Sequence, residues 1–128
     1  MNLLLDTCTF LWLVTGSDQL SPTARTLFSD PDNDVYLSAA SAWEISIKWS
    51  LGKLPLPETP EKFVTEQREN HFISPLPISE NATFLLPKLP NHHKDPFDRI
   101  LVCQAIEHNL TILTIDPLIQ KYPVKTIW

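Results

Sequence analysis

The sequence predicts one α/β domain with a central, mostly parallel β-sheet flanked by helices. Short apolar or β-branched runs alternate with helical patterns along the chain, which is typical of successive βαβ units. A chain of 128 residues is long enough for one hydrophobic core, and its length makes a single domain, residues 1–128, the expected organisation.

Five segments have the composition of strands. Leu3-Leu4-Leu5 is too short for a helix and, being apolar throughout, fits a strand buried on both faces. Leu110–Ile115 is rich in β-branched residues. Two prolines weaken the segment Ile73–Ile78, because proline cannot donate to a sheet ladder. The remaining candidates are Val35–Ser38 and Val124–Ile127.

Helical patterns lie between these strands. The pattern from Ala39 to about Leu51 places Trp43, Ile47 and Leu51 on one apolar stripe, and Gly52 follows its end. Four more helices are expected: Thr7–Val14, one opened by Ser21-Pro22, one by Thr59-Pro60, and one from Ser79 that ends before Pro87.

The last predicted helix, Phe97–His108, begins after Asp95-Pro96 and ends at Asn109, a plausible left-handed stop. We expect one apolar stripe of this helix to face the sheet. The stripe consists of Ile100, Leu101, Ala105 and Ile106.

The net charge of −5 argues against generic polyanion binding through a basic surface. A nucleic-acid partner would therefore need a local positive feature, which a bound metal ion can supply.

Cys8 and Cys103 match no metal or redox spacing and are expected to be small buried hydrophobes in a reducing cytoplasm. The apolar N-terminus carries Asp6 in its middle and lacks a basic start and a cleavage site. The run Phe10–Val14 is too short to span a bilayer, so no membrane association is expected.

Acidic residues follow two of the predicted strands. Asp6 comes directly after the first strand and Asp116 directly after Leu110–Ile115. Ligands of open parallel sheets bind beyond the carboxyl ends of the strands, so both acids should share one edge. Glu44 lies in the first turns of the helix after the second strand and can point to the same edge.

Asp98 is harder to place, because its helix leads into a strand. Each acid also has a structural interpretation. Ser41 with Glu44 fits a capping box, Glu44 with Lys48 fits an ion pair, and the other three acids fit helix caps or turns.

Several carboxylates at one edge would raise one another's pKa values unless a cation neutralised them. Mg²⁺ or Mn²⁺ is the expected ion, since hard cations prefer oxygen ligands. The sequence thus makes Asp6, Glu44, Asp98 and Asp116 candidates for one catalytic metal site, with the structural interpretation of each acid still open.

Longer strings of residues resemble a known family. The segments LLDTCTFLWL, VYLSAASAWEISIKWSLGKL, HHKDPFDRILVCQA and LTILTIDPLIQKY are similar to the VapC-type toxins of the PIN-domain family, in order, over essentially the whole chain. The resemblance implies a PIN-like fold and an Mg²⁺- or Mn²⁺-dependent endoribonuclease that cleaves RNA through a metal-activated water.

The resemblance also implies partners and supporting residues. It implies a cytoplasmic toxin of a prokaryotic toxin–antitoxin pair, homodimers, and neutralisation by a small VapB-like antitoxin that covers the active-site groove. It favours Asp98 over Asp95 as a ligand, leaving Asp95 as a helix cap or support, and gives supporting roles to Thr114 and Thr7.

The basic residues near these acids are candidates for RNA contact: His93, Lys94, Arg99 and Lys48. Arg99 suits a phosphate. The alternative is a solvated loop in which Arg99 pairs with an acid. A zinc site at the adjacent His92 and His93 is disfavoured by ligand geometry.

Two other functions stay open from the sequence: a catalytically silent PIN-like binding module, and a nuclease that acts on DNA or structured nucleic acid. Trp12 and Trp43 are expected in core or dimer packing, whereas Trp49 is expected to be exposed. Only two glycines occur, which excludes a glycine-rich phosphate loop.

Overall fold

The computed structural model describes residues 1–128 and contains one five-stranded sheet. Its spatial order is β3-β2-β1-β4-β5 and all four strand pairings are parallel, which confirms the predicted fold class. The strands are β1 (Asn2–Leu5), β2 (Asp34–Ser38), β3 (Ser74–Leu76), β4 (Thr111–Leu113) and β5 (Thr126–Ile127).

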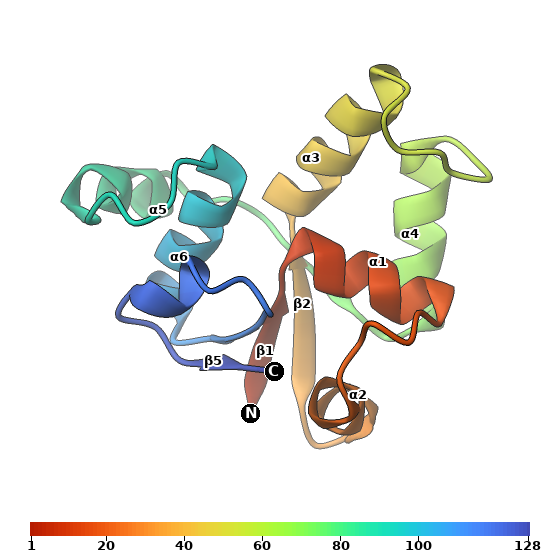
Figure 1. Ribbon diagram of the computed structural model, residues 1–128, viewed down its shortest axis with the longest axis horizontal. Coiled ribbons are helices and arrows are strands. Elements are labelled where there is room, and N and C mark those ends of the chain that lie inside the picture. The colour runs from red at the N-terminus through yellow and green to blue at the C-terminus, as the bar shows by residue number, and fades with distance from the viewer.

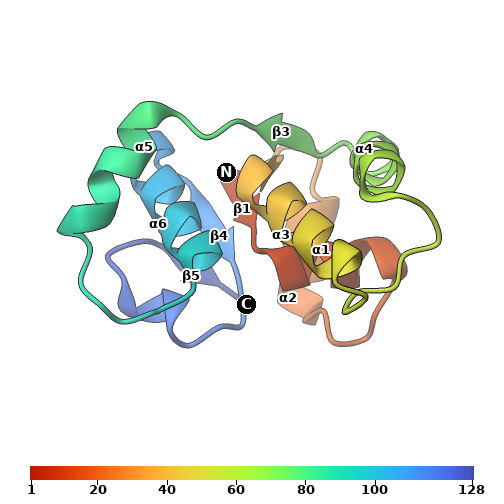
Figure 2. The same cartoon turned by 90° about the horizontal axis from the view of Figure 1, so that it is seen from above.

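Helices lie on both sides of this sheet. In Figures 1 and 2, α5 and α6 occupy one side, and α1 to α4 occupy the other. The helices are α1 (Thr7–Thr15), α2 (Pro22–Ser29), α3 (Ala39–Ser50), α4 (Pro60–Asn70), α5 (Glu80–Leu85) and α6 (Pro96–His108), with 3₁₀ turns η1 (Leu86–Lys88) and η2 (Ile119–Lys121).

The central strand β1 is buried on both faces, as its three leucines predict. Leu3 and Leu5 belong to the core beneath α1 and α4, whereas Leu4 belongs to the second core beneath α6. All three side chains are fully buried. Because side chains alternate along a strand, this one tripeptide joins the two hydrophobic layers.

The helix boundaries follow the local sequence signals. Ser21, Ser79 and Asp95 each accept a backbone N–H with their side chains and begin α2, α5 and α6. Asn109 ends α6 in the left-handed conformation at φ 54°, and Gly52 has φ 69° just beyond α3.

The strands at the end of the chain are shorter than expected. β4 covers only three residues of Leu110–Ile115, because the Thr114 hydroxyl accepts the backbone N–H of Asp116 and the chain turns out of the sheet. β5 likewise keeps only the last two residues of Val124–Ile127. β3 is the central part of Ile73–Ile78.

The prediction that the apolar stripe of α3 through Trp43 and Leu51 is its buried face is wrong. Trp43 is 59% exposed and Leu51 is also exposed, whereas Ala40, Glu44 and Ile45 are buried. The capping box is also wrong, because the N-cap is Ser38, whose hydroxyl accepts from Ala40 N–H.

One position of the predicted α6 stripe is wrong: Ile106 is 39% exposed. The buried face instead continues through Val102, Cys103 and Gln104, since α6 packs between the sheet and α5. None of the helices combines the length and the apolar character needed to cross a membrane.

We expect Leu4→Ala to lower the free energy of unfolding by about 2–5 kcal/mol, because it leaves a cavity in the centre of the sheet. The exposed Leu51 provides the matched control, and Leu51→Ala should change stability by less than about 0.5 kcal/mol. Chemical denaturation measures both. Equal losses in the two variants would contradict the assignment of β1 as the central strand.

Candidate metal centre

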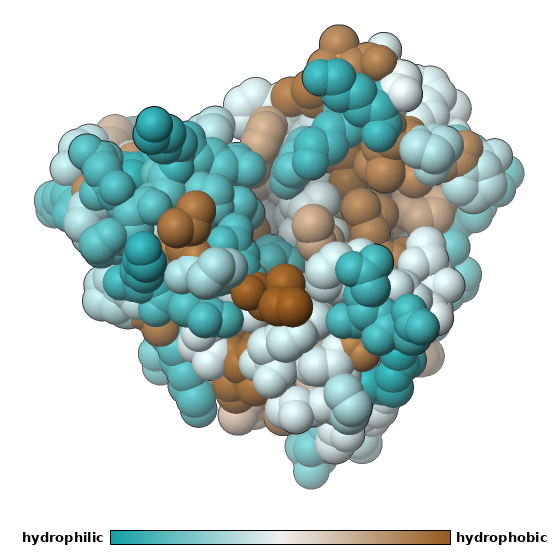
Figure 3. Space-filling view, in the orientation of Figure 1, coloured by the Kyte–Doolittle hydropathy of each residue, from teal (hydrophilic) through white to brown (hydrophobic).

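The carboxyl edge of the sheet holds a cavity of about 510 Å³. It lies at the topological switch point of the sheet, because β2 and β3 extend the sheet from β1 to one side and β4 and β5 to the other. Figure 3 shows a hollow in the middle of this face of the molecule. The acidic residues that line the cavity are Asp6, Glu44, Asp95, Asp98 and Asp116.

Asp6 lies at the junction of β1 and α1 and is only 5% exposed. Its Oδ1 accepts the backbone N–H of Thr9 at 2.8 Å, and its Oδ2 accepts the Thr114 hydroxyl at 2.5 Å. Burial raises the pKa of this carboxyl above its ordinary value, against the opposing effect of these hydrogen bonds. Thr114 therefore supports Asp6 directly.

Glu44 is 7% exposed and has a donor on each carboxylate oxygen. The Thr7 hydroxyl donates to Oε1 at 2.7 Å, and Lys48 Nζ donates to Oε2 at 2.7 Å. The hydrogen bond that Lys48 donates to Glu44 raises the pKa of Lys48. The predicted Glu44–Lys48 ion pair is confirmed, and it lies inside the cavity wall.

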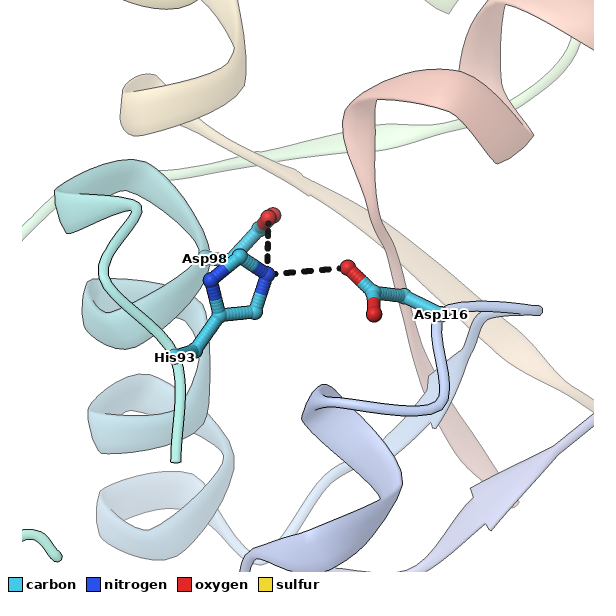
Figure 4. A group of neighbouring side chains, drawn as sticks. All are labelled: His93, Asp98 and Asp116. Atoms are coloured by element: carbon cyan, nitrogen blue, oxygen red, sulfur yellow. Dashed lines mark hydrogen bonds and ion pairs between the residues drawn. The ribbon is translucent and has the colours of Figure 1, made fainter. Parts of the chain in front are cut away.

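Asp98 and Asp116 approach each other from α6 and from the segment after β4. His93 Nε2 lies 3.0 Å from Asp98 Oδ2 and 2.9 Å from Asp116 Oδ2 (Figure 4). One ligand-type atom from each of these three residues lies within 4.8 Å of the other two.

The pKa of Asp98 is raised from 3.8 to about 7. Burial is the largest cause, followed by the negative charge of Asp95, and His93 acts in the opposite direction. Asp6 and Glu44 also raise this pKa, so three other acids act on this one carboxyl group.

This donor set fits a hard divalent cation. The oxygens come from carboxylates, which Mg²⁺ and Mn²⁺ prefer. Burial raises the pKa values of Asp6 and Asp98, so their ionised forms are costly in the folded chain without a neutralising cation. Asp6, Glu44, Asp98 and Asp116 are the residues that would hold the ion.

A family model decides the identity of the fold: the PIN domain matches residues 3–125. The chain belongs to the PIN-domain family. The relationship suggested by the sequence strings is thereby confirmed.

This PIN domain is similar to a curated protein in sequence and to several solved structures in fold. Ribonuclease VapC16 of Mycobacterium tuberculosis (strain ATCC 25618 / H37Rv) is 42% identical over 68 residues, 53% of this chain and 48% of the relative. The match thus spans about half the length of the curated relative.

Among solved structures, VapBC2 from Rickettsia felis bound to a promoter DNA fragment has a TM-score of 0.73 at 16% identity, over 99% of this chain and 98% of that chain. FitAcB from Neisseria gonorrhoeae has a TM-score of 0.63 at 20% identity, over 98% and 96%. At these identities the similarity shows the fold.

Asp95 caps α6 of the PIN domain, accepting Phe97 N–H with its Oδ1 at 2.8 Å. The capping role predicted for it is therefore present in the structure. Its charge still acts on the site, since it is the second cause of the raised pKa of Asp98.

Arg99 forms hydrogen bonds within the protein and is not paired with an acid. Its guanidinium donates to the backbone oxygens of Leu86 at 3.1 Å and Pro90 at 3.2 Å, and to the Tyr122 hydroxyl at 3.3 Å. The predicted pairing with an acid is wrong, and the side chain is directed into the protein. Arg99 therefore fixes the loop before α6, whereas Lys94 remains exposed on it.

The expectation that Cys8 is buried is wrong: it is exposed and lines the cavity, whereas Cys103 is buried as expected. Its position at the start of a helix on the carboxyl edge, two residues after Asp6, was the signal available in the sequence.

The tryptophans differ from one another. Trp12 packs edge-on against Trp128 and also lines the cavity. Trp43 packs against Phe97 with ring centroids 5.0 Å apart but is mostly exposed, so core packing is wrong for it. Trp49 is exposed, as expected.

Metal-free protein should lose thermal stability as the pH rises from about 4 to about 7. Asp98 binds its proton more tightly in the folded chain, so its contribution is fully present below the unfolded pKa and is lost as the pH passes about 7. Melting curves in EDTA should show the midpoint falling by several degrees. Asp98→Asn should flatten this dependence.

Asp32 is an exposed acid outside the cavity, and Asp32→Asn is the matched control that should keep the wild-type dependence. Identical pH profiles for the wild type and Asp98→Asn would show that the folded protein does not raise the pKa of Asp98.

Proposed function

We propose that this PIN domain is a divalent-metal-dependent endoribonuclease that acts as the toxin of a VapBC-like toxin–antitoxin pair. One observation carries the proposal: carboxylates from four separate elements line one cavity at the carboxyl edge of the sheet. The identity of 42% over 68 residues with a curated ribonuclease supports RNA as the substrate.

The proposed ligands are Asp6, Glu44, Asp98 and Asp116, which would hold Mg²⁺ or Mn²⁺. When bound, the ion would supply charge neutralisation at the scissile phosphate and lower the pKa of water. The reaction adds a water oxygen to phosphorus and breaks the bond to the 3′ oxygen, which leaves a 5′-phosphate and a 3′-hydroxyl.

The chain's own side chains orient these acids. Thr114 and the Thr9 backbone N–H fix both oxygens of Asp6, and Thr7 and Lys48 fix both oxygens of Glu44. Fixed carboxylates need little rearrangement when a charged substrate enters, which favours the transition state. Lys48, with its side chain half exposed, and Lys94 are proposed contacts for RNA phosphates.

The proposed partner is a small VapB-like antitoxin, and the proposed assembly is a homodimer in a prokaryotic cytoplasm. Support comes from the solved relatives, whose names describe VapBC and FitAB proteins and a toxin–antitoxin complex from Klebsiella pneumoniae. The full acid set argues against a silent binding module, because such a module has no need for crowded carboxylates.

Asp6→Asn and Asp98→Asn should each lower RNA cleavage to below about 1% of the wild-type rate, since each removes a proposed ligand. Asp32→Asn should cleave at the wild-type rate. EDTA should stop cleavage, and Mn²⁺ or Mg²⁺ should restore it. Gel analysis of end-labelled RNA and DNA of matched sequence provides the measurement.

Full activity in EDTA, or in both site variants, would contradict the mechanism. Cleavage of the DNA alone would replace the ribonuclease by a deoxyribonuclease. No cleavage of either polymer by metal-loaded protein would favour the silent module.

Expression of the wild type should arrest bacterial growth, whereas Asp6→Asn should not. Co-expression of the small reading frame adjacent to the gene should restore growth and block cleavage, because an antitoxin would cover the cavity. Light scattering should give twice the chain mass of 14.6 kDa. Unchanged growth together with normal RNA cleavage in vitro would contradict the toxin role but would still support the proposed nuclease activity.

A further inference from the structure

His93 occupies the space between two proposed metal ligands. Its side chain is only 12% exposed, and Nε2 lies within 3.0 Å of both Asp98 Oδ2 and Asp116 Oδ2 (Figure 4). Two chemical roles fit these distances. The nitrogen is either a third metal ligand that offers a lone pair, or a hydrogen-bond donor that offers a proton.

The other ring nitrogen distinguishes these roles. The backbone N–H of Asp95 donates to His93 Nδ1 at 3.1 Å. A donor meets a lone pair, so Nδ1 carries no proton, and the proton of the neutral ring is on Nε2. Metal-binding histidines show the opposite arrangement, in which the second nitrogen donates its N–H to a carboxylate, carbonyl or water.

The protein imposes this ring position from several sides. The backbone N–H of His93 donates to the Tyr122 hydroxyl at 2.9 Å. Arg99 donates hydrogen bonds to the backbone carbonyls of His93, at 3.4 Å, and of Pro90, and so holds the loop that carries His93. Asp95 caps α6, which orients the N–H that meets Nδ1.

We propose that His93 is a positioning residue whose Nε2–H bridges Asp98 and Asp116 and that it is not a metal ligand. Asp98 comes from α6 and Asp116 from the segment after β4, and two carboxylates that repel each other need a shared donor to stay together. Carboxylate oxygens keep further lone pairs for an ion while they accept this bond.

The bridge makes the site ready for an ion before the ion arrives. Asp116 Oδ1 accepts the backbone N–H of Leu118 at 2.8 Å, so the carboxylate of Asp116 is held at both oxygens only while His93 is present. Loss of a partner that orients metal ligands typically weakens metal binding by about 10- to 100-fold. This inference rests on the proposed function, because it assumes that the acids bind a metal.

The tautomer is tested on metal-free and Mg²⁺-loaded wild-type protein labelled with ¹⁵N-histidine. Long-range ¹⁵N–¹H correlation spectra should show an unprotonated Nδ1 and a protonated Nε2 for His93 in both samples. With Mn²⁺, pulsed electron paramagnetic resonance should show no directly bonded imidazole nitrogen. A protonated Nδ1 or a nitrogen bonded to Mn²⁺ would overturn the inference.

The positioning role is tested by titration calorimetry of Mn²⁺ into variants. His93→Ala should bind Mn²⁺ about 10- to 100-fold more weakly. His93→Gln should recover most of the affinity, because its amide N–H reaches a similar place. His108→Ala, at the far end of α6, should bind like the wild type. Unchanged affinity in His93→Ala would overturn the inference.

Circular dichroism shows whether each variant folds. If His93→Ala does not fold, the recovery in His93→Gln and the spectra of the wild type decide the question. If the wild type binds Mn²⁺ but cleaves no nucleic acid, the proposed nuclease activity is contradicted, whereas the proposed positioning role of His93 is not. Wild type that binds no divalent ion overturns both.

Discussion

Electrostatic repulsion among carboxylates at one edge of a parallel sheet is the constraint on which the rest of this structure depends. The sheet brings negative charge to one cavity, where burial, followed by the negative charge of Asp95, raises the pKa of Asp98 to about 7. The surrounding residues hold these carboxylates with hydrogen-bond donors rather than with a broad basic surface. Hydroxyls, one lysine and one imidazole hold the acids in place; these donors are Thr7, Thr114, Lys48 and His93.

The two hydrophobic layers determine where this charge is concentrated. Strand β1 is buried on both faces and lies between β2 and β4, so Asp6 emerges at the centre of the sheet edge. Asp116 emerges one strand away, because β1 and β4 pair directly. A slip of one residue in β1 would exchange the core faces of its leucines, so the apolar cores and the position of Asp6 are set together.

The sequence was sufficient for the features that depend on local pattern and failed where packing chooses between equivalent faces. Strand-end reasoning placed Asp6 and Asp116, and capping chemistry placed the start of α6. Periodicity found α3 but selected the wrong stripe, since Trp43 and Glu44 both lie on regular helical spacings and only the tertiary contacts decide which is buried. His93 was recognised only as a basic loop residue, because its contact with Asp116 joins positions 23 residues apart.

The distribution of positive charge explains how a protein of net charge −5 can accept a polyanion under the proposed function. Arg99, the strongest candidate for a phosphate in the sequence, uses its donors on backbone carbonyls that hold the His93 loop. Its contribution to the site is therefore indirect: it positions the imidazole that positions two carboxylates. A cation held by these acids would relieve their repulsion and attract phosphate at the same point, so the surface needs no broad basic patch.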